Sequence, residues 1–412
     1  MWKIKTILPP LGISFVLLNT AIGIWANFFT GGKSGMSNVL VFVGILLIIN
    51  YRNLLNWRFP VWNRYFTSLL LYEFLCIFYF YISPIEQDIR LLYFHLAVIA
   101  FMVALATRKN IDEDALLSCF FSLSLFATLC GLWAIYSGLM ERAFLAGENM
   151  DSLSESQGSV LELFTVSSAG YYCFVGSLLL FKKKKIALRL LALLAIFFSI
   201  LLIVLCTKRN LFVKIAFASL VFLYNQNKLR HLLTLRNVLL TVVAVAVLYY
   251  LISLSEGGML ALQDMVDNTF SGIHDMITGE QTDKSGSASA RAIQRKEGLD
   301  LIFNEMSWWN YLLGVGYMWK WLDVPLVQAF CDMGVIGLYF FVSLCILRPL
   351  KAIIKNRQSS MVVLMGLLLT AHLTQCMSSG HPYIFQYYIG PVFLFWALKR
   401  NSSMCVIILK KI

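Results

Sequence analysis

Long apolar runs recur along almost the whole chain, and one long polar stretch, from Leu254 to Asp323, interrupts them. A helix that crosses a membrane needs about 20 apolar residues to cover roughly 30 Å of hydrocarbon. Hydrophobic residues make up 59% of the chain and charged residues only 14%, whereas soluble domains carry about 25% charged residues. We therefore expect an all-α polytopic membrane protein, a bundle of about twelve transmembrane helices with one large, partly helical extramembrane loop.

The apolar runs predict where these helices lie, to within a few residues. The expected spans are Ile7 to Phe29, Ser37 to Asn50, Tyr65 to Ile82, Leu91 to Ala106, Ala115 to Met140, Leu163 to Phe181, Ile186 to Cys206, Leu211 to Tyr224, Val238 to Leu254, Val324 to Leu347, Met361 to Met377 and Gln386 to Leu398. The second and eighth runs are short for a full crossing. The chain is expected to divide into a membrane bundle at 1–254, the loop at 255–323 and a second part of the bundle at 324–412.

The distribution of charge predicts the orientation of the bundle, because Lys and Arg accumulate in cytoplasmic loops. With the N-terminus inside, Lys and Arg dominate the inner segments, whose only acids are Asp112, Glu113 and Asp114. The outer segments carry more acids than bases. The net charge of +12 therefore reflects orientation in a membrane, and nucleic acid is not an expected partner. The long loop is expected to lie outside the cytoplasm.

A cationic helix is predicted inside the loop, from Ala288 to Phe303. Arg291 and Arg295 are one turn apart on it and share a face, and neither has an acid three or four residues away. Two like charges at this spacing repel unless an anion lies between them. An anionic ligand is the functional interpretation, and a solvated or tertiary-paired helix face is the alternative.

A second cationic pair, Lys208 and Arg209, lies in the short connection between two spans. Cations at the membrane surface on the side that positive residues avoid need a partner or a watery cavity. Lys214, about one turn deeper, could face the same cavity. The alternative is a hairpin tip whose long side chains reach the water. Guanidinium groups grip phosphate in a bidentate manner, so a lipid diphosphate would satisfy both this pair and the loop arginines.

Two further residues are candidates for chemistry at the outer surface. Asp323 directly precedes Val324 and Pro325 and could be a base, an orienting group or a helix N-cap. His381 lies in the last outer loop, where a structural role is the alternative. Ionisable and amide residues within spans either line a cavity or satisfy one another; these are Glu73, His95, Asp332, His372 and Gln375. No pattern of residues indicates a metal site.

Taken together, these features resemble the O-antigen polymerase and ligase superfamily, in particular the Wzy-type polysaccharide polymerases. That family combines many spans, a large late periplasmic loop, an arginine at the outer end of an earlier hairpin and a Ser/Arg-rich helix in the loop. Leu-x-Gly-x-Gly and then Gly-x-x-Gly follow. The matching parts of this chain are Arg209, Ser287 to Arg295, Leu312 to Gly316, and Asp323 through Gly334 and Gly337. By motif the resemblance covers Thr207 to Gly337.

The resemblance implies a glycosyltransferase of the bacterial inner membrane, multi-pass, with its active site facing the periplasm and without a cofactor. A growing glycan on undecaprenyl diphosphate would pass to a lipid-linked repeat unit, so that the donor, the acceptor and membrane lipid are the expected partners. A chain-length regulator and a flippase are possible further partners. Arg209, Arg291 and Arg295, assisted by Lys208, would bind the diphosphate, and Asp323 or His381 would be catalytic.

Two other functions stay open at this point. A flippase for lipid-linked oligosaccharides also fits many spans with buried cations, but it needs no long outer loop, and related halves are expected for it. An O-antigen ligase would share the donor. Ligase-like members of the superfamily carry a histidine just before the Gly-x-x-Gly span, where this chain has Asp323, and the difference favours a polymerase.

Overall fold

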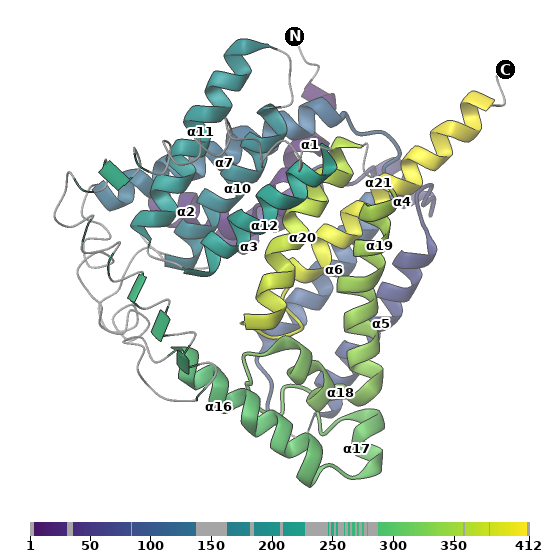
Figure 1. Ribbon diagram of the computed structural model, residues 1–412. Helices are drawn as coiled ribbons and strands as arrows, with labels where there is room; N and C mark the ends of the chain where they lie inside the picture. The colour runs from purple at the N-terminus through teal and green to yellow at the C-terminus, as the bar shows by residue number, and fades with distance from the viewer. Residues whose placement is uncertain are drawn as a thin grey trace. The chain divides into compact units, whose positions relative to one another are not determined.

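The computed structural model describes residues 4–30, 36–83, 85–136, 163–181, 185–206, 209–226, 287–356, 359–378 and 380–409, with scattered positions between 246 and 278. These residues form helices, and none of them forms a strand (Figure 1). Among the described residues, five helices are long and apolar enough to cross a membrane: Arg64–Ile82, Ile89–Ala106, Glu113–Tyr136, Ile186–Leu205 and Pro325–Lys355. The predicted all-α class is therefore confirmed, and these helices support the prediction of a membrane protein.

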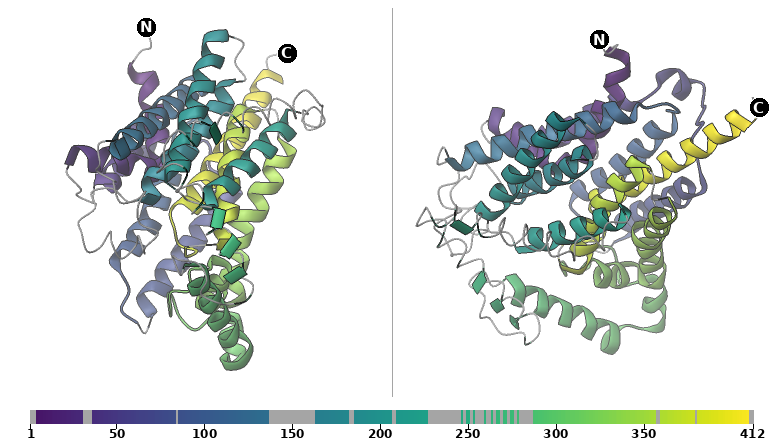
Figure 2. Two further views of the ribbon diagram at one scale, coloured as in Figure 1. Left: turned by 60° about the vertical axis from the view of Figure 1, so that its left-hand side comes forward. Right: turned by 45° about the horizontal axis from the view of Figure 1, so that its top comes forward.

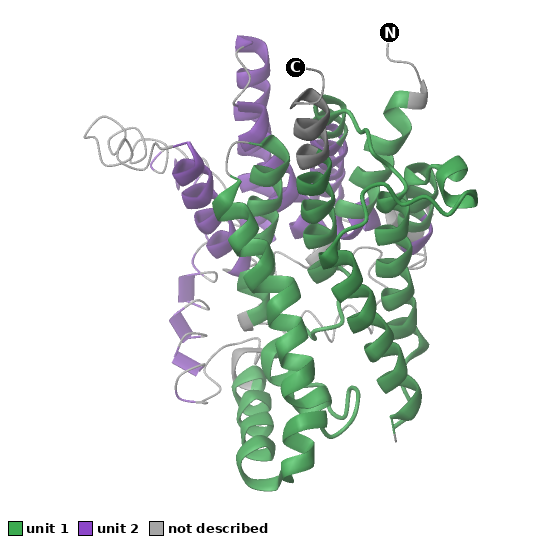
Figure 3. Ribbon diagram, turned by 90° about the vertical axis from the view of Figure 1, so that its right-hand side faces the viewer, with its two compact units in different colours: residues 1–17, 40–119, 290–412 green, residues 18–39, 120–289 purple. Residues whose placement is uncertain are grey.

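The chain packs as two compact units, coloured separately in Figure 3. Unit 1 comprises Met1–Leu17, Leu40–Cys119 and Ala290–Ile412, and unit 2 comprises Leu18–Val39 and Phe120–Ser289. These units group residues by packing, whereas the divisions predicted at 254 and 323 follow membrane crossings. Most of the predicted loop helix, from Ala290 onward, belongs to unit 1.

Unit 1 holds most of the candidate site. Its helices are α1 (Ile4–Leu17), most of α3 (Met36–Ile48), α4 (Tyr51–Leu55), α5 (Arg64–Ile82), α6 (Ile89–Ala106), most of α16 (Ser287–Asp300), α17 (Trp308–Leu313), α18 (Pro325–Phe341), α19 (Arg348–Lys355), α20 (Ser360–Ser378) and α21 (Gln386–Leu409). Two π-helical segments, η1 (Leu301–Glu305) and η2 (Val342–Leu347), continue α16 and α18. Helices α5 and α6 pack against each other, α21 packs against α6 and α20, and α17 packs against α18 (Figures 1 and 2).

The connections of unit 1 gather at two opposite ends of its helices. At one end, Arg108 donates hydrogen bonds to the carbonyls of Ile48 and Ile49, and Trp396 Nε1 donates to the carbonyl of Arg108. These segments are the ones that charge assigns to the inner side. At the other end, Ser83 and Gln87, which flank the α5–α6 connection, donate to the carbonyl of Tyr317. This second end carries the candidate site.

Unit 2 is a separate helical bundle. It contains α2 (Asn19–Thr30), most of α7 (Glu113–Tyr136), α10 (Leu163–Phe181), α11 (Ile186–Leu205) and α12 (Arg209–Asn225). Thr128 Oγ1 of α7 donates to the carbonyl of Ala169 in α10, whereas other buried hydroxyls bond within their own helices, as Ser177 Oγ does to the carbonyl of Cys173 and Ser199 Oγ to that of Ala195. Bonds within a helix satisfy hydroxyls in an apolar bundle without a tertiary partner.

Most of the described helices begin and end close to the predicted spans. The span predicted at Tyr65 to Ile82 is α5, Arg64–Ile82, and the loop helix predicted at Ala288 to Phe303 is α16 with η1. The single span predicted at Ile7 to Phe29 is wrong, because the chain there forms two helices, α1 and α2, that meet at Leu18. Asn19 and Thr20 are the polar residues at this break, and two polar residues within a long apolar run do not divide it by hydropathy. The span predicted at Val238 to Leu254 lies almost entirely outside the described residues.

Candidate functional site

The site end of unit 1 is built on an interruption of α18. The backbone leaves helical geometry at Met333 (φ −134°, ψ 15°) and Gly334 (φ 62°, ψ −155°). The carbonyls of Cys331 and Asp332 accept hydrogen bonds from the N–H groups of Val315 and Gly316, at 2.8 and 3.3 Å. The segment that follows α17 therefore supplies partners for backbone groups that the interruption would leave unpaired.

Two glycines make this contact possible. A Cβ at Gly314 would lie 2.2 Å from the carbonyl oxygen of Asp332, and one at Gly334 would lie 2.4 Å from the carbonyl group of Leu312. Both residues also have positive φ, at 80° and 62°, where L-residues are strained. The Leu-x-Gly-x-Gly and Gly-x-x-Gly motifs therefore interlock, backbone against backbone.

The buried carboxylate of Asp332 links α18 to the segments that contain Leu322 and Tyr383. Its Oδ1 accepts from Gln328 Nε2 and its Oδ2 accepts from the Tyr383 hydroxyl, at 2.8 and 2.9 Å. Gln328 Oε1 in turn accepts the N–H of Leu322, at 2.8 Å. Asp332 and Gln328 are fully buried, so these bonds replace the water that the groups lose. The chain of contacts positions Leu322, and with it the adjacent Asp323.

A second buried chain runs inward from the same place. The Tyr317 hydroxyl lies 2.7 Å from His95 Nε2, and His95 Nδ1 lies 2.6 Å from Glu73 Oε2. With Glu73 ionised, His95 donates from Nδ1, and its Nε2 accepts the Tyr317 hydroxyl proton. The ring of Tyr317 stacks on Tyr383, with centroids 4.2 Å apart. Burial raises the pKa of both tyrosines well above its usual range, so both hydroxyls stay neutral donors.

Above these chains, Asp323 forms a half-buried ion pair with Arg291. Arg291 Nε lies 2.9 Å from Asp323 Oδ2, and the two side chains are 33% and 23% exposed. Asp323 Oδ1 accepts the backbone N–H of Gly380. Asp323 has a positive φ of 46°; this costs free energy in a non-glycine residue, and its two bonds help to hold it there. Neither Nη atom of Arg291 has a hydrogen-bond partner among the described residues.

His381 lies beside this pair, one residue after Gly380. It is 5% exposed, and its ring meets that of Trp321 edge to face, with centroids 4.8 Å apart. Burial lowers the pKa of His381 to about 4. The imidazole is therefore neutral at pH 7. Its Nδ1 accepts the N–H of Tyr383 at 3.3 Å, so the proton of the neutral ring is on Nε2.

The arrangement has a clear chemical capacity. Arg291 presents two Nη groups at a partly exposed position, which suits an oxyanion ligand such as a phosphate. Asp323 aligns the guanidinium through Nε, and the glycine interlock and the Asp332 contacts hold the Asp323 loop in place. Trp321, half exposed beside His381, offers an aromatic surface next to the ion pair.

The structure brings together three of the six residues predicted for the site: Arg291, Asp323 and His381. Arg295 is exposed on α16, one turn after Arg291. Arg209 begins α12 in unit 2. Its side chain and all of Lys208 lie outside the described residues.

Two of the roles considered for these residues can be decided. The N-cap role for Asp323 is wrong, because Val324 is the N-cap of α18 and Asp323 bonds to Arg291 and Gly380 instead. Arg291 is paired through Nε with Asp323, as the alternative of a tertiary-paired helix face predicted. Its Nη atoms have no hydrogen-bond partner among the described residues, so the pairing does not prevent them from contacting an anion. Within spans, Glu73 and His95 contact each other through Oε2 and Nδ1, as one of the alternatives held, although the buried Oε1 of Glu73 has no partner among the described residues.

Sequence reasoning did not identify Tyr317, Tyr383 and Gln328 as parts of the site. Tyr317 is 222 residues from its partner His95, and Tyr383 is 51 residues from Asp332. Neither separation follows a helical period. The available signal was chemical, since buried acids within spans require hydrogen-bond donors, and tyrosines at the ends of neighbouring segments can supply them.

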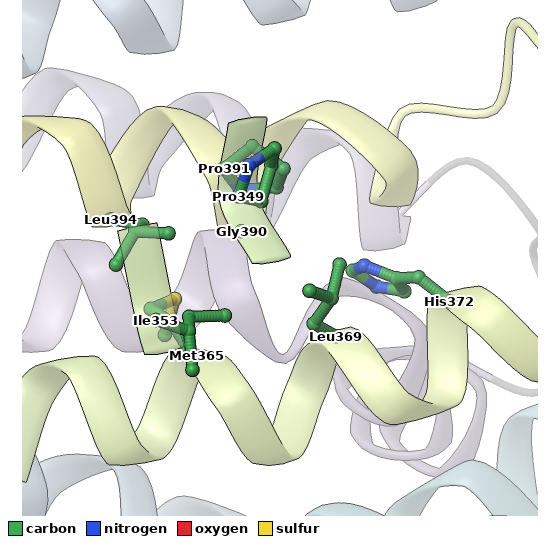
Figure 4. Close-up of a pocket in the computed structure, with 8 residues that line it drawn as sticks. All are labelled: Pro349, Ile353, Met365, Leu369, His372, Gly390, Pro391 and Leu394. Carbon is green, nitrogen blue, oxygen red and sulfur yellow. The ribbon is translucent and has the colours of Figure 1, made fainter. Parts of the chain in front are cut away.

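A small cavity lies deeper in unit 1 and is separate from the ion pair (Figure 4). It is lined by Pro349, Ile353, Met365, Leu369, His372, Gly390, Pro391 and Leu394. It has space for about one water molecule, so it cannot hold a substrate. Within the residues that the structure describes, no three His, Cys, Asp or Glu side chains are placed to hold a metal ion.

Comparison with known proteins adds nothing to this geometry. No known protein family matches the chain, and no curated protein matches it. The site is therefore interpreted from its own residues.

Proposed function

We propose that the protein is a polymerase of lipid-linked polysaccharide repeat units, acting at the outer face of a bacterial inner membrane. In this reaction a glycan carried on undecaprenyl diphosphate is transferred to a hydroxyl of a second lipid-linked unit. The observation that supports this function best is the ion pair of Arg291 and Asp323, in which the arginine is held through Nε while neither Nη atom has a hydrogen-bond partner among the residues that the structure describes.

The reaction needs positive charge mainly at the diphosphate that leaves the donor. A bond forms between the acceptor oxygen and the anomeric carbon of the donor glycan, while the bond from that carbon to the diphosphate oxygen breaks. The acceptor hydroxyl gives its proton to a base, and the lipid diphosphate leaves with the bonding electrons. Charge therefore accumulates on the diphosphate, where a guanidinium stabilises the transition state more than the ground state.

Asp323 is assigned as a positioning residue. Its two carboxylate oxygens accept from Arg291 and from Gly380, so both are engaged with the protein. It orients Arg291, much as a carboxylate orients a catalytic imidazole. His381 is a poor candidate for the base, because Nδ1 is engaged with Tyr383 and Nε2 carries the proton. Its Nε2–H can act as a hydrogen-bond donor instead.

Three further cations complete the proposal. Arg295 shares the exposed face of α16 with Arg291. Two guanidinium groups one helical turn apart can both contact one diphosphate. Arg209 and Lys208 are assigned to the same anion from the sequence alone. Arg209 is also the first residue of α12, which is consistent with anion binding at a helix N-terminus.

The decisive experiment is a glycan ladder made by the purified protein in vesicles that contain lipid-linked repeat units. Arg291→Ala is expected to slow chain growth by about 10²-fold, the typical cost of removing one group that stabilises transition-state charge. Arg209→Ala is expected to act in the same direction. Both variants should insert and purify in normal amounts; Arg291→Ala breaks only one partly exposed ion pair.

Lys320→Ala is the matched control. Lys320 forms an exposed ion pair with Glu297 of α16, at 2.9 Å, so the substitution removes a cation of the same region that lies outside the site. Its ladder should equal that of the unmodified chain. Unchanged ladders in both Arg291→Ala and Arg209→Ala would overturn the assignment.

A double-mutant cycle tests the role of Asp323. If Asp323 acts through Arg291, Asp323→Asn slows the reaction in the unmodified protein and has no further effect in Arg291→Ala. Multiplied effects would mean that Asp323 acts independently of Arg291, for example as the base. Arg291→Lys should not restore the rate, since the three N–H groups of an ammonium diverge from one nitrogen and cannot reproduce the planar fork of a guanidinium.

A transporter of lipid-linked oligosaccharide is the second candidate, and the buried Glu73–His95–Tyr317 chain favours it. Chains of acids and histidines within spans are typical of proton-coupled transporters. In that case the protein would move a fluorescent lipid-linked unit across sealed vesicles under a pH gradient, and Glu73→Gln would abolish this. Movement without any ladder would support the transporter, and a ladder in leaky vesicles would support the polymerase.

A further inference from the structure

A patch of exposed apolar rings lies next to the site but takes no part in the proposed reaction. The tryptophan patch consists of Phe303 of η1 and Trp308, Trp309, Leu312 and Leu313 of α17. The exposed fractions range from 42% for Leu312 to 74% for Phe303. The rings of Trp308 and Trp309 stack on each other, with centroids 3.6 Å apart. Contiguous apolar surface of this kind marks a place of interaction.

The packing of α17 explains why this face is turned outward. Residues 308, 309, 312 and 313 share one side of the helix by their spacing. The other side carries Tyr311, whose ring meets Phe330 of α18 at 5.9 Å and whose hydroxyl donates to the carbonyl of Ile302. Helix α17 is therefore held to unit 1 by Tyr311, and its four apolar side chains are only partly covered by the described residues.

The patch continues a surface that already faces lipid. The Tyr79 hydroxyl of α5 donates to the carbonyl of Leu313, at 2.9 Å, so the end of α17 lies against the last turns of a membrane-crossing helix. On α5 itself, Phe74, Phe78 and Tyr81 are 57%, 57% and 69% exposed. Exposed apolar side chains on such a helix face hydrocarbon, and the patch extends that face beyond Ile82, where α5 ends.

We infer that the tryptophan patch is a membrane-surface anchor, which inserts α17 into the interface between the lipid headgroups and the hydrocarbon on the side that carries the site. Indole rings favour this layer because it accommodates an apolar body with a polar N–H. Lipid fits better than a glycan, since none of the five side chains has a hydroxyl, amide or carboxylate to bond a sugar. The inference does not depend on the proposed function.

The anchor has a consequence for the site. Helix α17 leads directly into the segment that interlocks with α18 and ends at Asp323. A helix seated in the interface sets the height of that segment above the hydrocarbon. The ion pair of Arg291 and Asp323 would then lie close to the headgroup layer, the level at which a lipid diphosphate is found.

Tryptophan fluorescence in vesicles tests the anchor. The protein is reconstituted into phosphatidylcholine whose acyl chains are brominated near the headgroup, and emission is compared with that in unbrominated lipid. Trp308→Phe/Trp309→Phe is expected to lose a component that brominated lipid quenches and that acrylamide in the water does not reach. The single variants Trp308→Phe and Trp309→Phe report the two rings separately and keep an apolar ring at each exposed position.

Trp321→Phe is the matched control, because Trp321 is 50% exposed but lies beside His381 and outside the patch. Its lost component should be quenched by acrylamide and not by brominated lipid. The anchor is refuted if the emission of Trp308 and Trp309 behaves like that of Trp321. It is also refuted if their emission changes only with added lipid-linked oligosaccharide, or only with rising protein-to-lipid ratio, since these outcomes identify a glycan or a second copy as the partner.

Discussion

The arginines at the two ends of unit 1 use their guanidinium groups in opposite ways. At the end opposite the site, Arg108 gives Nε and an Nη to the carbonyls of Ile48 and Ile49, at 2.5 and 2.9 Å. Arg400, 3% exposed, gives one Nη to the carbonyl of Ile111 at 3.0 Å and the other to Glu113. At the site end, Arg291 gives Nε to Asp323, and its Nη atoms have no acceptor among the described residues.

This difference separates structural from functional cations in a chain that contains many. Arginines whose terminal donors bond to main-chain carbonyls tie neighbouring connections together and leave little for a ligand. An arginine that is oriented through Nε and keeps both Nη groups available is arranged to bind something else. Both kinds of arginine carry the same charge, so they are distinguished by the groups that accept their hydrogen bonds.

The glycine interlock should show the largest effect, because the backbone contacts that build the site end depend on it. Gly314→Ala or Gly334→Ala places a methyl group within 2.2 or 2.4 Å of backbone at positive φ. We expect a loss of at least about 3 kcal/mol in the free energy of unfolding, measured as a lower melting temperature in detergent. Gly176→Ala is the control, since its Cβ meets nothing closer than 3.4 Å. Equal melting temperatures for all three variants would show that the interlock is not needed.

Acid should destabilise the site end selectively, since arginines do not titrate. The pKa of His381 falls from its ordinary value of 6.5 to about 4 through burial. Between these values the unfolded state binds the proton and the folded state does not. The contribution of the neutral His381 to the free energy of unfolding is therefore complete above pH 6.5 and is lost as the pH falls toward 4. The loss attributable to His381 is up to about 3 kcal/mol. It is measured as the difference between the melting curves of the unmodified chain and His381→Gln; parallel pH profiles would contradict it.

A stability comparison of two arginine variants gives the smallest effect and the most direct test of the contrast. Arg108→Ala leaves two carbonyls without their charged donors and should lower the free energy of unfolding by about 2 kcal/mol. Arg291→Ala breaks one half-exposed pair and should cost less than about 1 kcal/mol, although it slows glycan transfer. Thermal unfolding of both variants in the same detergent measures the difference. If Arg291→Ala lowers the free energy of unfolding more than Arg108→Ala does, the distinction between the two ends does not hold.

The positions of helices were predictable from the sequence where hydropathy alone determines the two ends of the helix. The ends of α5 and α6 lie within two residues of the predicted spans, because both helices run between polar connections. The break at Leu18 and the interruption at Gly334 were not predictable. Hydropathy reports how apolar a segment is and not the direction of its backbone, and Gly334 in a span is more often a packing position.

The site was predictable as a set of residues but not as an arrangement. Arg291 and Asp323 each stood out, one as a cation without a local acid and the other as an acid before a span. Their pairing across 32 residues depends on how α16 packs on α18, through Gly298 against Val327 and Leu322. That packing leaves no periodic signal in the sequence, so the role of Asp323 could be assigned only from coordinates.

The interruption of α18 also bears on how the protein is made. Its carbonyls at Cys331 and Asp332 take their hydrogen bonds from Val315 and Gly316, which belong to a segment outside the span. When a span first enters the bilayer, a continuous helix is the state that satisfies its backbone without help. The bend at Gly334 therefore arises only after the preceding segment has docked, and a ribosome-bound chain truncated after the span should hold this helix straight until residues 311–319 settle on it.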